Sequence, residues 1–448
     1  MSETLGTGPS APPDAGGPPQ PRARRSFLAR QFPPFTPRQW RVFWISTTAG
    51  YFDSYDGALL SLALRQIQQG LGIAEASLGA MLSAIRLGYL GSMLISPLAD
   101  VFGRRRLLLV TIIGYTIFTA LSAIAPDARS FVVSQTLARA FSGAETTISL
   151  VILAEEVDAA VRGWAIGMQG ALAISGYGLA AIVFGFITIV PYGWRGLYAL
   201  ALLPLLLIIP LRRMLPESRR FAAELASGAS PRSALEPLVA LFRSHPGRIT
   251  MVFAVWFLYA AGAAPGAVFV PKYLQEIHHW SPARVASLYI FGGAIGIVGN
   301  IVAGRISDSF GRRTMGVAFM LAGPLAELLL YSVGAGGGVI LFWIGWLFCD
   351  QAATTVLNAY GAELFPTSHR SAAGSVLIVA RYGGGAVGLL LEGLFYSAAG
   401  GHWTAIRWLL VSWFVAAIVM LLCFPETAGR ELEAIAPETG ATTSAAAL

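Results

Sequence analysis

Long apolar runs separated by short polar stretches dominate the chain from residue 41 to residue 424. Each run holds about 20 apolar residues, enough to cross the hydrocarbon core of a bilayer as one helix. The strands of a membrane barrel would instead alternate apolar and polar residues over about 10 positions. The pattern therefore predicts an all-α membrane protein with twelve transmembrane helices. The predicted spans cover about residues 41–64, 77–99, 107–125, 131–154, 163–190, 194–215, 248–271, 283–303, 314–335, 338–360, 371–398 and 402–424.

A short basic loop occurs twice, once after the second span and once after the eighth. It reads Asp-Val-Phe-Gly-Arg-Arg over residues 100–105 and Asp-Ser-Phe-Gly-Arg-Arg over residues 308–313. Because further landmarks recur at the same spacing and in the same order, we predict two homologous six-helix bundles. These landmarks are Glu155 and Arg162 in the first half and Glu363 and Arg370 in the second.

The duplication and the polar stretches together predict the domain boundaries. We expect a disordered cytoplasmic tail over residues 1–38, an amino-terminal six-helix bundle over 39–215, a cytoplasmic central loop over 216–246, a carboxy-terminal six-helix bundle over 247–425 and a cytoplasmic tail over 426–448. The first tail is rich in Pro, Gly and Ser, so it cannot bury enough apolar surface to offset its ordering entropy. No short apolar core with a small-residue cleavage site follows a basic start, so we expect no cleaved signal.

Composition and charge narrow the class of protein further. Apolar residue types make up 55% of the chain and charged ones only 12%, which is too apolar for a soluble surface. The net charge of +7 does not indicate nucleic-acid binding, because the arginines lie in loops and form no continuous basic face. Most of them fall on the side of the two termini and the central loop, which the positive-inside rule assigns to the cytoplasm. We expect a multi-pass monomer in the lipids of the cell membrane.

The sequence carries no signature of an ATP-driven pump or a redox enzyme. A phosphate-binding loop needs a lysine after its glycines, and the only lysine, Lys272, lies far from any such loop. The five histidines fall in loops or at span ends rather than at mid-helix, where haem would be held. Cys349 and Cys423 lie in apolar runs, where packing is expected. We therefore expect no enzymatic activity, no cofactor and no metal.

Nine ionisable residues fall inside predicted spans, where an unpaired charge is costly. The helical rise places Asp53 and Asp56 about 18 and 22 Å above the cytoplasmic face and Arg139 at about 18 Å. By the same count Asp350 and Arg381 lie at about 12 and 15 Å. We therefore expect at least one ion pair in each half. The nine residues are Asp53, Asp56, Glu145, Glu327, Asp350, Glu392, Arg86, Arg139 and Arg381.

The spans and the doubled loop resemble the major facilitator superfamily of secondary transporters over residues 40–430. Family members carry Gly-x-x-x-Asp-Arg-x-Gly-Arg-Arg between the second and third helices. Here Ser96 replaces the first glycine and Val101 the first arginine, while the second copy keeps Gly304 and has Ser309. The Glu and Arg landmarks and the segments Pro216-Glu217 and Pro425-Glu426 are similar to those of the sugar-porter-like branch.

In that branch the cytoplasmic loops form charge networks that hold the inner gate closed and break as it opens. The resemblance assigns this role to Asp100, Gly103, Arg104, Arg105, Glu155, Arg162, Asp308, Gly311, Arg312, Arg313, Glu363 and Arg370. The residue types support it, because glycine allows a tight turn and arginine can reach a carboxylate through two hydrogen bonds. The same arginines can instead serve only to fix the topology.

The branch also pairs an acid in the first helix with an arginine in the fourth, and Asp56 and Arg139 stand at those positions. Asp53, three residues earlier, resembles the Asp-x-x-Asp signature of the aromatic-acid:proton symporters. The glutamine pair of sugar carriers is missing from the seventh span, where residues 256–259 read Trp-Phe-Leu-Tyr. The resemblance therefore favours a substrate other than a sugar. The predicted proton-coupling residues are Asp53, Asp56 and Glu145.

We predict proton-coupled symport of a small organic solute, an aromatic or other carboxylate, because a guanidinium can hold a carboxylate at two points. Efflux of drugs or metabolites in exchange for protons, sugar:proton symport and a transporter-like sensor stay open as alternatives. Aromatic residues such as Trp256 and Tyr259 more often serve helix packing or interface anchoring than a pocket. The predicted substrate-binding residues are Arg86, Arg139, Trp256, Tyr259, Asp350 and Arg381, and Glu327 and Glu392 are interpreted as structural.

Overall fold

The computed structural model describes residues 33, 35–202, 236–333, 338–366, 369–431 and 435–436. These residues form helices and connecting turns, and no strand occurs among them. The first group of helices is α2 (Pro37–Leu62), α3 (Leu64–Leu71), α4 (Leu78–Ile95), α5 (Ala99–Phe102), α6 (Arg104–Ala123), α7 (Ala128–Glu156), α8 (Ala159–Gly185) and α9 (Trp194–Ala199). The second group is α12 (Glu236–Ser244), α13 (Pro246–Glu276), α14 (Pro282–Phe310), α15 (Arg312–Leu330), α16 (Gly338–Glu363), α17 (Arg370–Ala399) and α18 (His402–Cys423).

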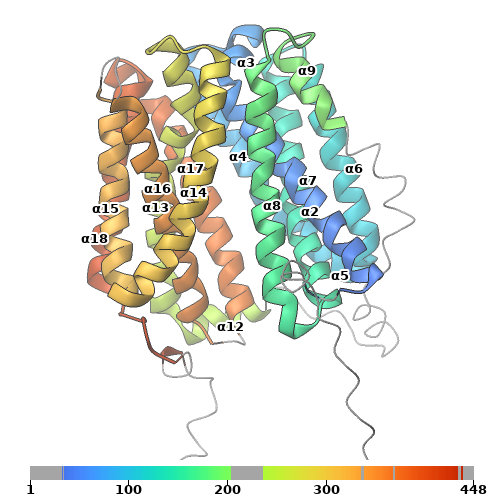
Figure 1. The fold of residues 1–448 in the computed structure, drawn as a ribbon, viewed down its shortest axis with the longest axis vertical. Helices are drawn as coiled ribbons and strands as arrows, with labels where there is room; N and C mark the ends of the chain where they lie inside the picture. Colours follow the sequence, from blue (N-terminus) through green and yellow to red (C-terminus); the bar gives the residue numbers. More distant parts are fainter. Residues whose placement is uncertain are drawn as a thin grey trace, which may run out of the picture.

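The two groups stand side by side as an amino-terminal half and a carboxy-terminal half (Figure 1). Helix α4 packs against α17 and α8 packs against α14, so the halves meet along these two helix pairs. Within the amino-terminal half α2 packs on α8 and α4 on α7, and within the other half α13 packs on α17 and α18. Residues on α2, α4, α7, α13 and α17 are therefore placed to meet near the middle of the molecule.

Ten helices among the described residues are long and apolar enough to cross a membrane. They match ten of the predicted spans. Helix α2 covers the first predicted span and is less apolar, since it carries Asp53 and Asp56 as well as Arg41. The sixth predicted span begins with α9 and a 3₁₀ turn at Leu200–Leu202, and residues 203–215 lie outside the described residues, as do most of the central loop and of the two tails.

Local sequence signals explain where several helices begin and end. Thr36 and Asp127 accept hydrogen bonds from the backbone of the first turns of α2 and α7 and form capping boxes there. Ser281 caps α14, followed by Pro282 in its first turn. Gly72 ends α3 with a left-handed backbone, φ 61°. These signals place the helix ends in the polar stretches between the apolar runs.

The doubled basic loop forms the same turn twice. Gly103 links α5 to α6 with φ 94° and ψ 135°, and Gly311 links α14 to α15 with φ 98° and ψ 135°. A side chain strongly disfavours this backbone conformation, so both positions depend on glycine. We call the end of the molecule that carries these turns the Gly-Arg-Arg end, and the opposite end, near α3, the α3 end (Figure 1).

Candidate functional site

A buried ion pair joins α2 to α7 in the amino-terminal half. The Nη2 atom of Arg139 lies 2.8 Å from Oδ2 of Asp56, and the two side chains are 2% and 0% exposed. The same Nη2 donates to the backbone oxygen of Asp56 at 3.2 Å and to Oε1 of Gln135 at 3.1 Å. Removing either charge would leave the other without its partner in a low-dielectric interior.

A second acid, Asp53, shares the same cation. Its Oδ1 lies 3.9 Å from Nη1 of Arg139, and its side chain is 20% exposed. Because Asp53 and Asp56 are three residues apart on α2, both face α7. One guanidinium cannot fully neutralise two carboxylates, so this pair is suited to binding a proton. Glu145, nearly two turns further along α7, is buried and forms no ion pair among the described residues.

Arg86 on α4 reaches across the boundary between the halves. Its guanidinium carbon lies 5.8 Å from the centre of the Tyr382 ring on α17. Gly385 makes this approach possible, since a Cβ there would lie 2.3 Å from Nε of Arg86. Arg381, beside Tyr382, is exposed and lies 5.8 Å from the centre of the Trp256 ring. Neither Arg86 nor Arg381 forms an ion pair with a carboxylate of the described residues.

Tyrosine rings from both halves border these charges. Tyr89 on α4 and Tyr382 on α17 stack with ring centres 4.3 Å apart. The guanidinium of Arg139 lies 5.8 Å from the centre of the Tyr89 ring. Tyr177 on α8 lies within electrostatic range of Arg86, Arg139 and Arg381. We call this group the central site, and its members are Asp53, Asp56, Arg86, Arg139, Arg381, Tyr89, Tyr177 and Tyr382.

In the carboxy-terminal half the expected ion pair between Asp350 and Arg381 is not formed, and that prediction is wrong for this structure. Oδ1 of Asp350 instead accepts a hydrogen bond of 2.6 Å from the Tyr259 hydroxyl, which also lies 2.9 Å from Oγ1 of Thr354. A tyrosine on the neighbouring helix is thus the nearer partner, while Arg381 turns toward Trp256. Tyr259 therefore contributes a hydrogen bond to Asp350 as well as an aromatic ring to the helix packing.

The two acids interpreted as structural have different surroundings. Glu392 is fully buried on α17 with Oε1 2.5 Å from Nδ1 of His402, so it has a partner at a helix end. Glu327 is fully buried on α15 and forms no ion pair among the described residues. It lies against Gly266 of α13, where a Cβ would fall 1.4 Å from its Oε1. The glycine on α13 is thus what leaves room for this carboxyl group.

At the Gly-Arg-Arg end, arginines of the doubled loop contact acids of the same half. Arg104 pairs with Glu155. Arg312 pairs with Glu363 at 2.8 Å and with Asp308 at 3.0 Å. The residues that the duplication aligned therefore make corresponding contacts. Because each pair lies within one half, these contacts stiffen the halves rather than join them in this structure.

Glu426, just after the last span, has a role that the sequence did not reveal. Its carboxylate accepts hydrogen bonds from the backbone N–H groups of Arg312, Arg313, Thr427 and Ala428, at 2.7 to 3.1 Å. An anion is favoured at a helix start, here that of α15. Burial alone would raise the pKa of this carboxyl, but the four N–H donors outweigh burial and hold the pKa below its ordinary value.

The other predicted gate residues lie at the same end. Arg162 donates to the backbone oxygen of Val157 at 3.5 Å, Arg313 donates to that of Phe424 at 3.5 Å, and Arg370 begins α17. Arg105 follows Arg104 in the first turn of α6. The side chain of Asp100 lies outside what the structure describes, as does Glu217. A contact that the sequence did not reveal joins Arg38 to Glu156 through two hydrogen bonds of 2.8 Å.

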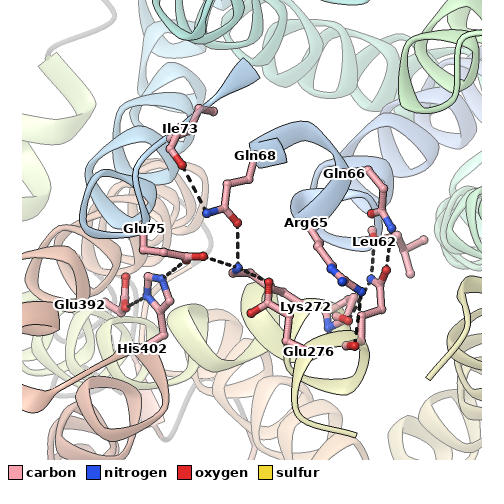
Figure 2. A network of polar contacts seen from close by, with 12 residues as sticks. Leu62, Arg65, Gln66, Gln68, Ile73, Glu75, Lys272, Glu276, Glu392 and His402 are labelled. Atoms are coloured by element: carbon pink, nitrogen blue, oxygen red, sulfur yellow. Dashed lines mark hydrogen bonds and ion pairs between the residues drawn. The ribbon is translucent and has the colours of Figure 1, made fainter. Parts of the chain in front are cut away.

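A second polar cluster, also unforeseen, lies at the α3 end (Figure 2). Nζ of Lys272 on α13 donates to Oε1 of Gln68 at 2.7 Å and lies 3.1 Å from Oε1 of Glu75. The other oxygen of Glu75 lies 2.8 Å from Nε2 of His402. In the sequence Lys272 stands out only as the single lysine, and His402 is one of the histidines in loops or at span ends. No local sequence pattern links them to Gln68 and Glu75, because these residues lie far away along the chain.

The helix arrangement and the buried charges between two halves define a multi-pass membrane protein of the transporter class. Residues 44–353 match the family described as Major Facilitator Superfamily, and residues 281–438 match Sugar (and other) transporter. The chain belongs to the Major Facilitator Superfamily. The resemblance noted in the sequence is thereby confirmed, and the protein is a transporter rather than an enzyme.

Similar proteins include a gallate transporter of Pseudomonas putida, 26% identical over 431 residues that cover 87% of this chain and 92% of the relative. The 4-hydroxybenzoate transporter PcaK of Pseudomonas putida is 26% identical over 400 residues, covering 80% and 86%. Among solved structures, the inward open conformation of the xylose transporter XylE from E. coli aligns with a TM-score of 0.70 at 19% identity, covering 89% of this chain and 99% of XylE. The last likeness shows the fold.

Proposed function

We propose that the protein is a proton-coupled symporter of small organic carboxylates, with aromatic acids as the preferred class. The observation that carries this proposal is the pair Arg86 and Arg381, two cations at the boundary of the halves with no ion pair to a described carboxylate. A guanidinium holds a carboxylate through two parallel hydrogen bonds. The nearby tyrosine rings suit the flat face of an aromatic acid. The names of the gallate and 4-hydroxybenzoate transporters support the same substrate class.

Proton coupling follows from the shared cation of Asp53 and Asp56. When a substrate carboxylate draws the Arg139 guanidinium away, Asp56 loses the charge that stabilises its ionised form and binds a proton more readily. Binding of substrate and binding of proton then favour each other, as linkage requires. Glu145, buried without an ion pair among the described residues, is an acid on α7, the helix that carries Arg139.

The proposed architecture has twelve spans in two six-helix bundles, with the Gly-Arg-Arg end and both termini in the cytoplasm and the protein as a monomer in the cell membrane. The arginines of the doubled loop support this orientation. Hydrogen bonds join the two halves at the α3 end, for example between Ser61 Oγ and the backbone oxygen of Val268 at 2.8 Å. We therefore assign this structure to a state closed at the α3 end.

Uptake into liposomes tests the substrate class. The purified protein, reconstituted with a more acidic outside, should accumulate radiolabelled 4-hydroxybenzoate, and a protonophore should abolish the accumulation. Arg86→Ala and Arg381→Ala should each lower uptake at least about tenfold, because a hydrogen bond to a charged group contributes about 1.5–3 kcal/mol. Arg284→Ala is the control, since Arg284 is exposed at the start of α14 over the ring of Trp280, 4.2 Å from its centre.

The acid variants test the coupling. Asp56→Asn should lose accumulation driven by the pH gradient and keep part of its substrate binding. If the parent accumulates none of 4-hydroxybenzoate, gallate and benzoate, the carboxylate assignment is wrong. If accumulation does not depend on the pH gradient, the proposed proton coupling is wrong. If Asp53→Asn and Asp56→Asn both accumulate substrate as the parent does, the proton is carried elsewhere, and Glu145→Gln is the next variant.

A further inference from the structure

The α3 end holds the two halves together through a cluster of ionisable side chains (Figure 2). Gln68 and Glu75 come from the amino-terminal half, whereas Lys272, Glu392 and His402 come from the carboxy-terminal half. The backbones also meet closely here, since a Cβ at Gly79 of α4 would lie 2.5 Å from the backbone nitrogen of Gly393 on α17. The cluster therefore spans an interface that must separate when the α3 end opens.

His402 stands between two carboxylates, one from each half. Its Nδ1 lies 2.5 Å from Oε1 of Glu392, and its Nε2 lies 2.8 Å from Oε2 of Glu75. A neutral imidazole has one N–H group and one lone pair, so it can donate to only one of these oxygens. The second short contact needs one more proton, on the imidazole or on a carboxyl group. The two short contacts together therefore require one proton more than a neutral histidine and two ionised carboxylates have.

The surrounding charges favour this extra proton. Around His402 are Glu75 on the 3₁₀ turn before α4, Glu392 and Tyr396 on α17, and Lys272 with Glu276 on α13. Three carboxylates therefore face one lysine, and a proton at His402 brings the charges closer to balance. Glu392 is 0% exposed, and its Oε2 has no hydrogen-bond partner among the described residues, so an ionised and unpaired form would be costly.

We propose that His402, Glu75 and Glu392 form a second proton-binding site, and that the proton bound there holds the α3 end closed. Opening this end moves Glu75 away from His402 and leaves the proton with one carboxylate fewer. The proton therefore binds more tightly to the closed state than to the open one, and by linkage a proton shifts the population toward closure. Acidification on the side of the α3 end would then promote closure after loading. This site is separate from Asp53 and Asp56 and does not depend on the substrate.

Distance measurements between the halves test the proposal directly. Spin labels at Gln69→Cys on α3 and Ser397→Cys on α17, both exposed positions near the α3 end, report the opening by electron–electron double resonance. The background carries Cys349→Ala and Cys423→Ser to remove the native thiols. In substrate-free protein in lipid nanodiscs the short-distance population should grow as the pH falls from about 8 to about 5, the range in which imidazole titrates. His402→Gln and Glu75→Gln should both remove this growth.

Three comparisons make the outcome decisive. His279→Gln changes an exposed histidine near the same end and should leave the response intact. Glu431→Gln changes an exposed acid beyond the last span, far along the chain from the α3 end, and should also leave the response intact. Glu75 is 39% exposed in its side chain, so Glu75→Gln should fold even if His402→Gln does not. The proposal is overturned if the parent's distances do not change with pH, or if Glu75→Gln keeps the parent's response.

Discussion

The guanidinium of Arg139 serves two carboxylates at once, with Asp56 at 2.8 Å and Asp53 at 3.9 Å. The nearer acid is fully buried and the farther one is partly exposed, so the two differ in access to water as well as in distance. In the proposed cycle, Asp53 can exchange protons with the solvent while Asp56 responds to the position of the arginine.

Substitution of one member of this pair should cost more than substitution of both. Arg139→Leu alone should lower the free energy of unfolding by about 3–5 kcal/mol, because it leaves a buried carboxylate unpaired. The double variant with Asp56→Leu should recover a large part of that loss. Thermal unfolding in detergent micelles measures both, and Arg129→Leu, an exposed position on the same helix, should change little. Additive losses in the double variant would mean that the contact contributes no coupling.

The partner of Asp350 should be identified by the same kind of cycle. Tyr259→Phe and Asp350→Asn should be coupled by about 0.5–3 kcal/mol, because they share a 2.6 Å hydrogen bond. Asp350→Asn and Arg381→Gln should be coupled more weakly than that, because the two charges lie within electrostatic range of each other but form no ion pair. Unfolding of the single and double variants distinguishes the two cases. Strong coupling of Asp350 to Arg381 would show that the ion pair forms in a state other than this one.

A side chain at position 266 should destabilise the protein while Glu327 is present. Gly266→Ala places a Cβ on the Glu327 carboxyl and should cost about 1–3 kcal/mol of stability. Gly293→Ala on α14 is the matched control, since nothing lies within 4 Å of its Cβ, and it should not destabilise the protein. Adding Glu327→Ala to Gly266→Ala should relieve the clash. A double variant less stable than Gly266→Ala would contradict this account.

Glu426 should make the stability of the Gly-Arg-Arg end depend on pH. Its pKa is lower in the folded protein than its ordinary value of 4.5, so its contribution is fully present above pH 4.5 and is lost as the pH falls through the folded pKa. Glu426→Gln should cost about 1 kcal/mol at pH 7, the usual contribution of an anion at a helix start. It should remove this part of the acid sensitivity. Unfolding at a series of pH values measures it, with Glu431→Gln, an exposed acid five residues on, as control.

Much of the fold follows from hydrophobic length alone. Ten predicted spans correspond to long apolar helices, because a bilayer sets the length of a helix that crosses it. The contact of Asp56 with Arg139 was expected from depth along the helices, which depends only on residue spacing, and separately from the family resemblance. The pairs Arg104 with Glu155 and Arg312 with Glu363 follow from the duplication in the same way.

The rest depends on how helices rotate and pack, which spacing does not determine. Depth placed Asp350 near Arg381, but the rotation of α16 brings Asp350 to Tyr259 instead. Lys272 and His402 gain partners from residues more than a hundred positions away in the chain, so no local pattern announces them. The contacts of Glu426 likewise could not be predicted from the side chains, because its partners are backbone N–H groups.

The paired turns at Gly103 and Gly311 limit which positions of the doubled loop can vary. At φ 94° and 98° with ψ 135°, each backbone lies in a region that glycine enters readily and that other residues almost never adopt. The two copies differ at Val101 and Ser309 and still turn the same way. The duplicated loops therefore share a backbone path that constrains the fourth residue of the loop and leaves the second free to change.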